Sequence, residues 1–583
     1  MTAPGSLTPS RFDQDHPHYR WIALSNTTLG VLLITINSSI VIISLPAIFR
    51  GIHLDPLQPQ NIGYLLWMIM GFLVVSAVLV VSLGRLGDMY GRVKIYNAGF
   101  TVFAAASVML AIDPFTGGSG AMWLIIWRVV QGIGGSMLFA NSAAILTDAF
   151  PSSQRGMALG INQVSAIAGS FLGLIIGGLL AEWHWRAVFW VSVPIGIIGT
   201  WWSFHSLREL GSRRKGRLDV PGNVTFAVGL TAILVAITYG IQPYGGHAMG
   251  WTNPWVVGGL VGGALLLVAF CVIENRVSDP MFAMDLFKIR AFSAGSLAGL
   301  LAAISRGGLQ FMLIIWLQGI WLPLHGYSFE STPLWAGIYM LPLTIGFLAA
   351  GPVSGYLSDR WGARAFSTGG PLLMAATFIG LLLIPVNFSY PLFAVLIALN
   401  GIGNGLFSAP NTTAIMNSVP AHKRGSASGM IGTFMNTGMA LSIGVFFSLM
   451  IAGLASALPT TLTNGLSERG VAPDVAQAVG ESPPVGSLFA AFLGKNPIAT
   501  LLEPFHALNS LPKPDVDTLT GNRFFPELIS EPFHHGLVIV FLAAAAMSIV
   551  ASAASSMRGS RYVHDELADS AEPEPVKAEA GRR

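Results

Sequence analysis

The sequence predicts an all-α protein that crosses a membrane many times. Hydrophobic residues make up 53% of the 583 residues and charged residues only 10%, so the chain lacks the polar surface that a soluble protein of this size needs. Apolar stretches of about 20 residues, enough to cross a hydrocarbon core of roughly 30 Å, recur along almost the whole chain. No Asp or Glu lies in the middle of any stretch, whereas two arginines do.

The apolar stretches predict fourteen membrane-spanning helices, in chain order. They cover residues 21–48, 62–83, 95–112, 122–147, 157–180, 187–205, 224–241, 255–273, 293–322, 334–357, 367–385, 391–410, 426–456 and 535–556. Of the 31 Lys and Arg residues, 23 lie in segments on one side, six on the other and two inside spans. Because cytoplasmic loops retain basic residues, we expect both termini in the cytoplasm and a plasma (inner) membrane location.

The excess of Lys and Arg in the segments on one side of the membrane accounts for the net charge of +3. We therefore expect no nucleic-acid partner. The single cysteine, Cys271, excludes an intramolecular disulfide and a cysteine-cluster metal site, and its apolar surroundings favour an inert packing role. A membrane enzyme would need His, Asp or Cys residues converging at one depth, but the histidines near the spans are scattered over separate loops. We therefore expect no catalytic residues, no metal and no cofactor.

The chain contains an internal duplication. The segment GIGGSMLFANSAAILTDAFPSSQRGMALG begins at Gly132, and GIGNGLFSAPNTTAIMNSVPAHKRGSASG begins at Gly401, an offset of 269 residues. The same offset, within two residues, relates GRLGDMYGRVK, from Gly84, to GYLSDRWGARA, from Gly355. Two similar bundles that rock about a shared site are how alternating-access carriers are built. We therefore expect two copies of one bundle and a transport function.

The loop after the second predicted helix carries a motif that the second copy repeats. Its residues are Gly84, Asp88, Gly91 and Arg92; the second copy repeats the spacing at Gly355, Asp359 and Gly362, and its arginine, Arg364, lies one position further along. Glycine permits a tight turn, and Asp88 can cap the next helix or pair with Arg92. The loop resembles the hallmark motif of the major facilitator superfamily, Gly-x-Leu-x-Asp-x-x-Gly-Arg-x-x, which implies a conformational latch between two bundles. A capped turn with topogenic charge would explain the composition but not the repeated spacing.

Two further motifs support the resemblance. Arg128 followed by Gln131 and Gly132 resembles the superfamily's Arg-x-x-x-Gly motif, which implies proton transfer or substrate binding; an arginine inside a span usually faces a cavity or a partner. The fifth helix resembles the antiporter motif Gly-x-x-x-Gly-Pro-x-x-Gly-Gly, except that Leu174 replaces the proline. Its glycines also suit plain helix packing. They are Gly169, Gly173, Gly177 and Gly178.

Other segments are similar to the 14-helix drug:proton antiporter branch of that superfamily. They are WHWRAVF with VPIG from Trp183, LDVPG from Leu218, Leu317-Gln318, GYS from Gly326, and Ala336-Gly337 with Leu341-Pro342. The resemblance implies a major facilitator fold, with two pseudo-symmetric six-helix bundles and two extra central helices. The expected domains are a tail at 1–20, bundles at 21–208 and 291–556, linker helices at 209–290, and a disordered tail at 557–583.

The chain departs from this branch in its first helix. There the branch reads Leu-Asp-x-Thr, whereas this chain has Asn37 in place of the aspartate. Asparagine can bind a substrate through hydrogen bonds but cannot carry a proton. A coupling proton would then be taken up at a span end, and Asp148 is our first candidate because its duplicate is Asn417. Asp148 can equally pair with Arg155 or with the Gly84 loop at the end of its helix.

Arg306 lies near the centre of the ninth predicted span and needs a partner there. Candidates are backbone carbonyls near Gly307 and Gly308, water, the carboxylate or phosphate of a substrate, or the side-chain amides of Asn37, Gln131 or Gln318. A structural pin and a substrate-binding role are both open. The outer loop at 457–534 contains the apolar stretches 485–493 and 497–502, which either fold back as a lid or lie at the membrane interface.

The sequence as a whole predicts a secondary transporter. No phosphate-binding loop of a primary pump is present, and a receptor without transport is the remaining rival. The resemblance implies multidrug efflux of hydrophobic or amphipathic small molecules, driven by a proton gradient and carried out by a monomer in the lipid bilayer. The alternative is export of a lipid or another anionic amphiphile with atypical or no proton coupling.

Overall fold

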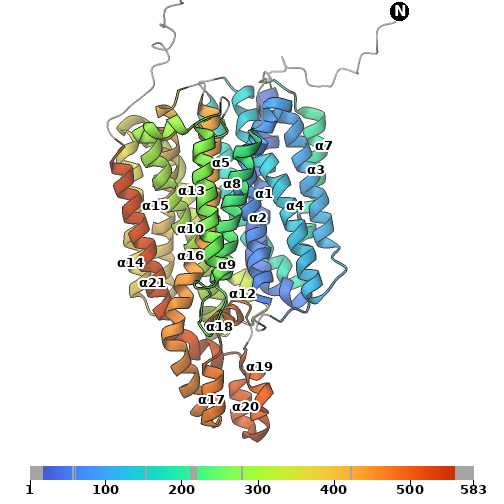
Figure 1. The fold of residues 1–583 in the computed structure, drawn as a ribbon, viewed down its shortest axis with the longest axis vertical. Helices are drawn as coiled ribbons and strands as arrows, with labels where there is room; N and C mark the ends of the chain where they lie inside the picture. Colours follow the sequence, from blue (N-terminus) through green and yellow to red (C-terminus); the bar gives the residue numbers. More distant parts are fainter. Residues whose placement is uncertain are drawn as a thin grey trace, which may run out of the picture.

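The computed structural model describes residues 18–55, 58, 61–151, 154–210, 219–277, 280–420, 423–494 and 496–558. Within these ranges, fourteen helices are long and apolar enough to cross a membrane. They run side by side in one bundle, from which a small group of helices protrudes (Figure 1). The predicted all-α polytopic fold is confirmed.

The first half consists of six spans. Their helices are α1 (Tyr19–Gly51), α2 (Ile62–Tyr90), α3 (Arg92–Ala111), α4 (Gly117–Ala149), α5 (Arg155–Trp183), α6 (Ala187–Trp190) and α7 (Ser192–Ser206). The last two form one span that is interrupted at Val191. Pro194 has no N–H to donate to the carbonyl of Trp190 four residues earlier, so the proline accounts for the interruption. By contrast α5, where Leu174 replaces the motif proline, is a continuous helix.

The second half repeats this arrangement. Its helices are α10 (Arg290–Trp316), continued by a π-helical turn η4 (Leu317–Trp321) and α11 (Leu322–Leu324), then α12 (Thr332–Tyr339), α13 (Leu341–Trp361), α14 (Ala363–Leu383), α15 (Tyr390–Ser418), α16 (Arg424–Ser467) and α21 (Phe524–Ser556). Here Pro342 lies just after the interruption between α12 and α13, as Pro194 does in the first half.

Two helices lie between the halves in the chain, α8 (Val220–Gly240) and α9 (Pro254–Glu274), followed by a short turn η3 (Met284–Lys288). α8 packs against α9 and also contacts both α2 and α16, one helix from each half. The linker pair therefore sits at the joint between the halves. Cys271 is exposed on α9, so the packing role expected for it is wrong.

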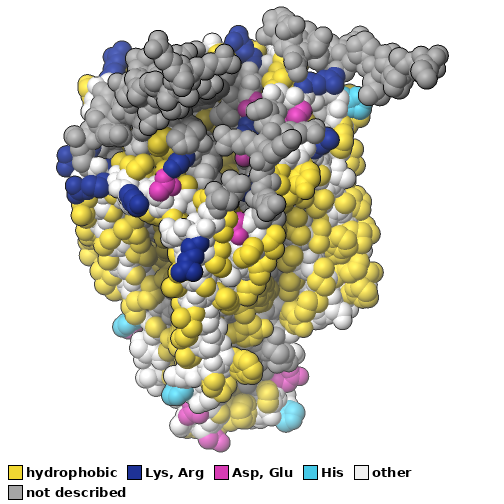
Figure 2. All heavy atoms as spheres, turned by 45° about the horizontal axis from the view of Figure 1, so that its top comes forward, with side chains coloured by type: hydrophobic (Ala, Val, Ile, Leu, Met, Phe, Trp, Pro, Cys, Tyr) yellow, Lys and Arg dark blue, Asp and Glu magenta, His cyan; other side chains and the backbone are white. Residues whose placement is uncertain are grey.

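The two ends of the bundle differ in charge. We call the end with Arg85, Arg92, Arg208 and Lys423 the basic end, and the opposite end, from which helices protrude, the extension end. Figure 2 shows lysines and arginines gathered at the basic end, above a broad apolar surface on the side of the bundle that faces the viewer. This distribution is the one that the positive-inside pattern predicts.

The predicted outer loop at 457–534 is mostly helical. α16 continues to Ser467 and α21 already begins at Phe524. Between them lie α17 (Pro473–Gly480), α18 (Pro484–Phe492), α19 (Ile498–Leu502), the turns η6 (Glu503–Phe505) and η7 (Ala507–Ser510), and α20 (Lys513–Leu519). α18 is buried, with Phe489 stacked on Phe447 of α16 and Phe492 beside Phe311 of α10. The stretch 485–493 thus folds back into the second half rather than lying at the membrane interface.

The halves touch at both ends of the bundle. At the basic end, Val81 of α2 lies 3.6 Å from the position that a Cβ would take at Gly429 of α16. At the extension end, the backbone of Leu334 on α12 lies only 2.4 Å from the corresponding position at Gly178 of α5. At Gly178 the missing side chain allows the two backbones to approach closely, whereas Gly429 meets the side chain of Val81. In this conformation the two halves are therefore in contact at both ends.

Candidate functional site

Arg128 is the centre of a buried polar network in the first half. Its Nη1 donates hydrogen bonds to Asn37 Oδ1 at 2.5 Å and to Gln131 Oε1 at 2.8 Å. Its guanidinium lies 4.6 Å from the centroid of the Phe72 ring, a cation–π distance. The side chain is almost fully buried, with 2% of the residue exposed. The structure therefore brings Asn37 of the first helix together with Arg128 and Gln131 of the Arg-x-x-x-Gly motif.

The network continues into two more helices of the same half. Asn37 Nδ2 donates to Ser192 Oγ at 3.1 Å, and Gln131 Nε2 donates to Ser107 Oγ at 2.9 Å. The polar contacts of Arg128 among the described residues are all with neutral groups, including the Met68 carbonyl at 3.4 Å. Because no carboxylate of the described residues joins it, this network carries a positive charge in an apolar bundle.

The second half has the same polar pair without the arginine. Asn400 Nδ2 donates to Thr377 Oγ1 at 2.8 Å, and these residues match Gln131 and Ser107 at offsets of 269 and 270. The position that corresponds to Arg128 is Ile397, which is fully buried. The duplication of this polar pair is thus preserved in structure, while the arginine beside it is present only in the first copy.

Arg306 occupies a small cavity in the second half. The cavity has a volume of about 30 Å³ and is also lined by Asn404, Asn411, Phe434 and Met435. The guanidinium makes one contact in the described structure, at 3.7 Å to Met439 Sδ, which is a weak acceptor. Among the described residues, no backbone carbonyl near Gly307 and Gly308 accepts a hydrogen bond from it, so the carbonyl pin considered above is not formed in this conformation.

The amides considered as partners of Arg306 lie elsewhere. Asn37 and Gln131 bind Arg128. Gln318 is in the π-helical turn η4, twelve residues from Arg306, which corresponds to about 18 Å along a helix. Both polar atoms of its amide are buried without a partner in the described structure, and π-helical turns often mark functional positions. Gln318 therefore stays a candidate for substrate contact, separate from the Arg306 cavity.

The glycines of α5 contact two different helices. Gly169, Gly173 and Gly177 face α1, where a Cβ would come within 2.5 Å of Thr35, Ile36 or Ile43. Gly178 instead faces α12 in the other half. The motif therefore combines packing within the first half with a contact across the joint.

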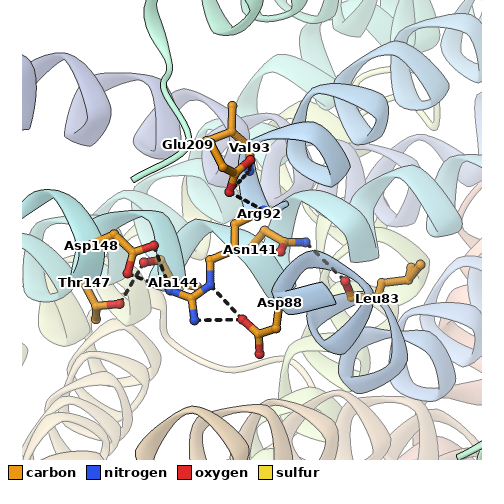
Figure 3. A network of polar contacts seen from close by, with 9 residues as sticks. All are labelled: Leu83, Asp88, Arg92, Val93, Asn141, Ala144, Thr147, Asp148 and Glu209. Carbon is orange, nitrogen blue, oxygen red and sulfur yellow. Dashed lines mark hydrogen bonds and ion pairs between the residues drawn. The ribbon is translucent and has the colours of Figure 1, made fainter. Parts of the chain in front are cut away.

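The loop that contains the predicted latch motif forms an ion-pair triad on Arg92 (Figure 3). Arg92 Nε lies 2.7 Å from Asp88 Oδ1, and Arg92 Nη1 lies 2.7 Å from both carboxylate oxygens of Asp148. Asp88 thus pairs with Arg92 rather than capping α3. Asp148 is the end-of-helix partner of the Gly84 loop through Arg92, one of the two roles considered for it above.

Glu209 provides the cap of α3 that the sequence analysis missed. Its Oε1 accepts from the backbone N–H of Arg92 at 2.7 Å (Figure 3). Gly91, with φ at +119°, makes the turn between α2 and α3, a conformation that glycine adopts easily. Glu209 follows Arg208 at the end of the first half, and nothing in its local sequence connects it with a loop more than a hundred residues earlier.

The second copy of the latch differs. Gly362 repeats the turn with φ at +85°, and Arg364 is exposed. The side chain of Asp359 lies outside the described residues. Gly84 and Gly355 both lie in helix, in α2 and α13.

Asp113 is a buried acid that was also missed, although it directly follows the third predicted span. It is 1% exposed, and Arg186 Nη2 donates to its backbone carbonyl at 2.8 Å. Burial raises the pKa of its carboxyl, while a hydrogen bond from the Phe115 N–H and the charge of Arg186 lower it. Its position between α3 and α4 places it at the extension end.

We expect Asp88→Asn to reduce transport without reducing membrane expression. The Asp88 and Arg92 side chains are 40% and 27% exposed, and exposed ion pairs typically contribute only about 0.2–1 kcal/mol to folding. A change of ~1.4 kcal/mol in the free-energy difference between two conformations changes their population ratio tenfold. Uptake into vesicles should therefore fall roughly tenfold or more. Asp474→Asn, on exposed α17, is the matched control. Full transport activity in Asp88→Asn would refute the latch assignment.

The fold and this polar interior define a membrane transporter with two repeated halves. The chain belongs to the Major Facilitator Superfamily, whose family model matches residues 27–443.

Curated relatives cover most of the chain. The tetracenomycin C resistance and export protein of Streptomyces glaucescens is 27% identical over 91% of this chain and 90% of its own length. The riboflavin transporter RibZ of Clostridioides difficile is 26% identical over 75% and 89%. The methyl viologen resistance protein SmvA of Salmonella typhimurium is 29% identical over 78% and 86%.

Among solved structures, a bacterial homolog of the human lysosomal transporter Spinster, in an inward-facing and unoccupied conformation, matches with a TM-score of 0.53. It is 16% identical and covers 94% of this chain and 100% of its own. An auto-inhibited peptide transporter of the POT family also matches with a TM-score of 0.53, at 14% identity over 82% and 96%. At these identities the likeness concerns the fold.

Proposed function

We propose that this chain exports hydrophobic or amphipathic small molecules across the plasma (inner) membrane by proton-linked alternating access. The observation that carries the proposal is the pair of contacts between the halves, Val81 with Gly429 at the basic end and Gly178 with Leu334 at the extension end. Opening one contact while keeping the other exposes the interior to one side at a time. Relatives named for export and resistance support the outward direction.

The basic end then faces the cytoplasm, where both termini lie. This orientation follows from the excess of Lys and Arg at that end. The protein acts as a monomer in the bilayer, with the small-molecule substrate as its partner and the proton gradient, rather than a cofactor, as its energy source.

A resistance screen combined with vesicle transport tests this function. Cells that over-express the protein should tolerate higher concentrations of hydrophobic drugs than cells that lack it, and inside-out vesicles should accumulate a fluorescent drug. An uncoupler that collapses the proton gradient should stop accumulation. Accumulation that continues unchanged after the uncoupler would refute proton linkage, and absence of accumulation for every compound that gives resistance would refute export.

Export of an anionic amphiphile is the second candidate, and the Arg306 cavity favours it. A guanidinium inside a bundle costs at least about 2.5–3.5 kcal/mol to insert, yet Arg306 has only the weak contact with Met439 in the described structure. Its neighbours Asn404 and Asn411 are neutral hydrogen-bonding groups. A carboxylate or phosphate bound beside Arg306 would receive a bidentate fork from its guanidinium.

We expect Arg306→Gln to lose preference for anions while remaining expressed. Removing one charge-assisted contact of ~1.4 kcal/mol lowers anion affinity about tenfold. Vesicle transport of a matched anionic and cationic dye gives the ratio of anion to cation transport. Arg276→Gln, at an exposed position, is the control. Equal or better export of the cation by the wild-type protein, or loss of expression instead of anion selectivity in the variant, would refute the anion site.

A further inference from the structure

Two buried carboxyl groups face each other between the linker helices. Asp219 precedes α8 and Glu274 ends α9, and they are 4% and 2% exposed. A Cβ placed on Gly222 would lie 2.2 Å from Asp219 Oδ2 and 2.9 Å from Glu274 Oε1. These two oxygens therefore point into the same small space, which is free because residue 222 is a glycine.

Each carboxyl group has one oxygen held by the backbone and one oxygen without a partner. Asp219 Oδ1 accepts from the Gly222 N–H at 2.9 Å, and Glu274 Oε2 accepts from the Phe282 N–H at 3.0 Å. The facing oxygens, Asp219 Oδ2 and Glu274 Oε1, are buried and accept no hydrogen bond in the described structure. Two such carboxylates cannot easily both be ionised, because like charges in a dry site repel.

A proton is the ligand that fits this pair. A divalent metal would need about four or more ligands, whereas here two oxygens are free, and the described residues contain no group of three or more His, Cys, Asp or Glu that could hold a metal ion. One proton on either carboxyl group removes one of the two buried negative charges and supplies an O–H donor on the side that faces the other carboxyl group.

The other titratable or charged groups near the pair are few among the described residues. From α2, Arg85 attracts Glu274 electrostatically and donates to the Pro280 carbonyl at 2.7 Å. On α9, Cys271 lies one turn before Glu274 and interacts with it. One proton on the pair leaves a single negative charge to face the positive charge of Arg85.

The pair is attached to the joint between the halves through residues 280–282. Ser82 of α2 contacts Met281 Sδ at 3.7 Å, and Ser426 of α16 donates to the Met281 carbonyl at 3.5 Å. Phe282, whose N–H holds Glu274, lies 6.3 Å from the Phe434 ring of α16. Phe434 also lines the Arg306 cavity. A displacement of Glu274 is therefore passed to both halves by direct contacts.

We propose that Asp219 and Glu274 hold one proton between their facing oxygens, and that release of this proton loosens the joint between the halves at the basic end. This deepens the proposed proton-linked export, on which its role in transport rests, by naming a proton-binding site outside the first helix. After release, two negative charges repel each other, and Glu274 pulls away from the backbone of residues 280–282.

Infrared spectroscopy of the purified protein tests the shared proton without any transport. At neutral pH the wild type should show a protonated-carboxyl band that disappears in Asp219→Asn and in Glu274→Gln, both of which preserve shape. Asp285→Asn is the matched control, because Asp285 is a 49% exposed acid paired with Lys423. A band that is absent from the wild type, or that survives in both single variants, would overturn the proposal.

Distance measurements test the effect on the joint. Spin labels at Lys94→Cys and Lys288→Cys, both exposed, report the separation of the halves at the basic end in a Cys271→Ser background. Raising the pH should lengthen this distance in the wild type but not in Glu274→Gln. The same pH dependence in both proteins would overturn the proposal. If these results are obtained but an uncoupler does not change vesicle transport, then proton-linked export is refuted and the shared proton of the carboxyl pair is not.

Discussion

Replacing Arg128 with lysine should reduce transport by at least about tenfold while the protein still reaches the membrane. Lysine keeps the charge but has a single nitrogen, whereas Arg128 binds Asn37 and Gln131 through Nη1 and the Met68 carbonyl through Nε. Losing one such bond to a charged donor costs about 1.5–3 kcal/mol, and ~1.4 kcal/mol is a factor of ten. The measurement is vesicle transport divided by the amount of protein in the membrane, compared between Arg128→Lys and the wild type.

Arg128→Met should have the larger effect, on stability as well as on transport. It leaves the oxygens of Asn37 and Gln131 buried without a donor, at about 1–3 kcal/mol each, so the melting temperature should fall and transport should be lost. Exposed Arg290→Gln serves as control and should change neither. If Arg128→Met transports normally, the polar network has no part in the cycle.

Gly178→Val should abolish transport by preventing closure at the extension end. Its Cβ would come within 2.4 Å of the Leu334 Cα, and a backbone atom cannot move aside as a flexible side chain can. Each half can still fold, because Gly178 faces across the joint. We therefore expect normal expression, no vesicle accumulation, and a protein held open at this end.

The matched control is Gly258→Val on α9, where a Cβ would meet nothing within 4 Å. Spin labels at Trp183→Cys and Glu330→Cys, both exposed, report the separation of α5 from the segment that precedes α12. The distance should increase in Gly178→Val and stay unchanged in the control. Wild-type distance together with wild-type transport would show that the extension end closes elsewhere.

These predictions separate two kinds of glycine within one motif. Gly173 and Gly177 contact α1 inside the first half, so substitutions there should impair folding. Gly178 contacts the second half, so a substitution there should impair the conformational cycle. The spacing of the motif does not distinguish these roles, since all four glycines lie on one continuous helix.

The sequence by itself determined the number of spans, the duplication, the family and the latch motif. All of these are local properties or comparisons of one segment with another. The length of an apolar stretch decides whether a helix can cross a bilayer. The motif of Gly84, Asp88 and Arg92 is recognised from its local spacing alone. Hydrophobicity did not determine where the helices end, because α16 and α21 continue beyond the apolar stretches.

Only the tertiary structure decided which polar groups become partners. Arg128 and Asn37 are on different helices, as are Asp219 and Glu274, and their contacts depend on how each helix is rotated and how deeply it packs. The burial of α18 likewise depends on the space left between α10 and α16. A buried polar atom forms a hydrogen bond only where packing places a partner beside it. Those packed neighbours are distant in the chain.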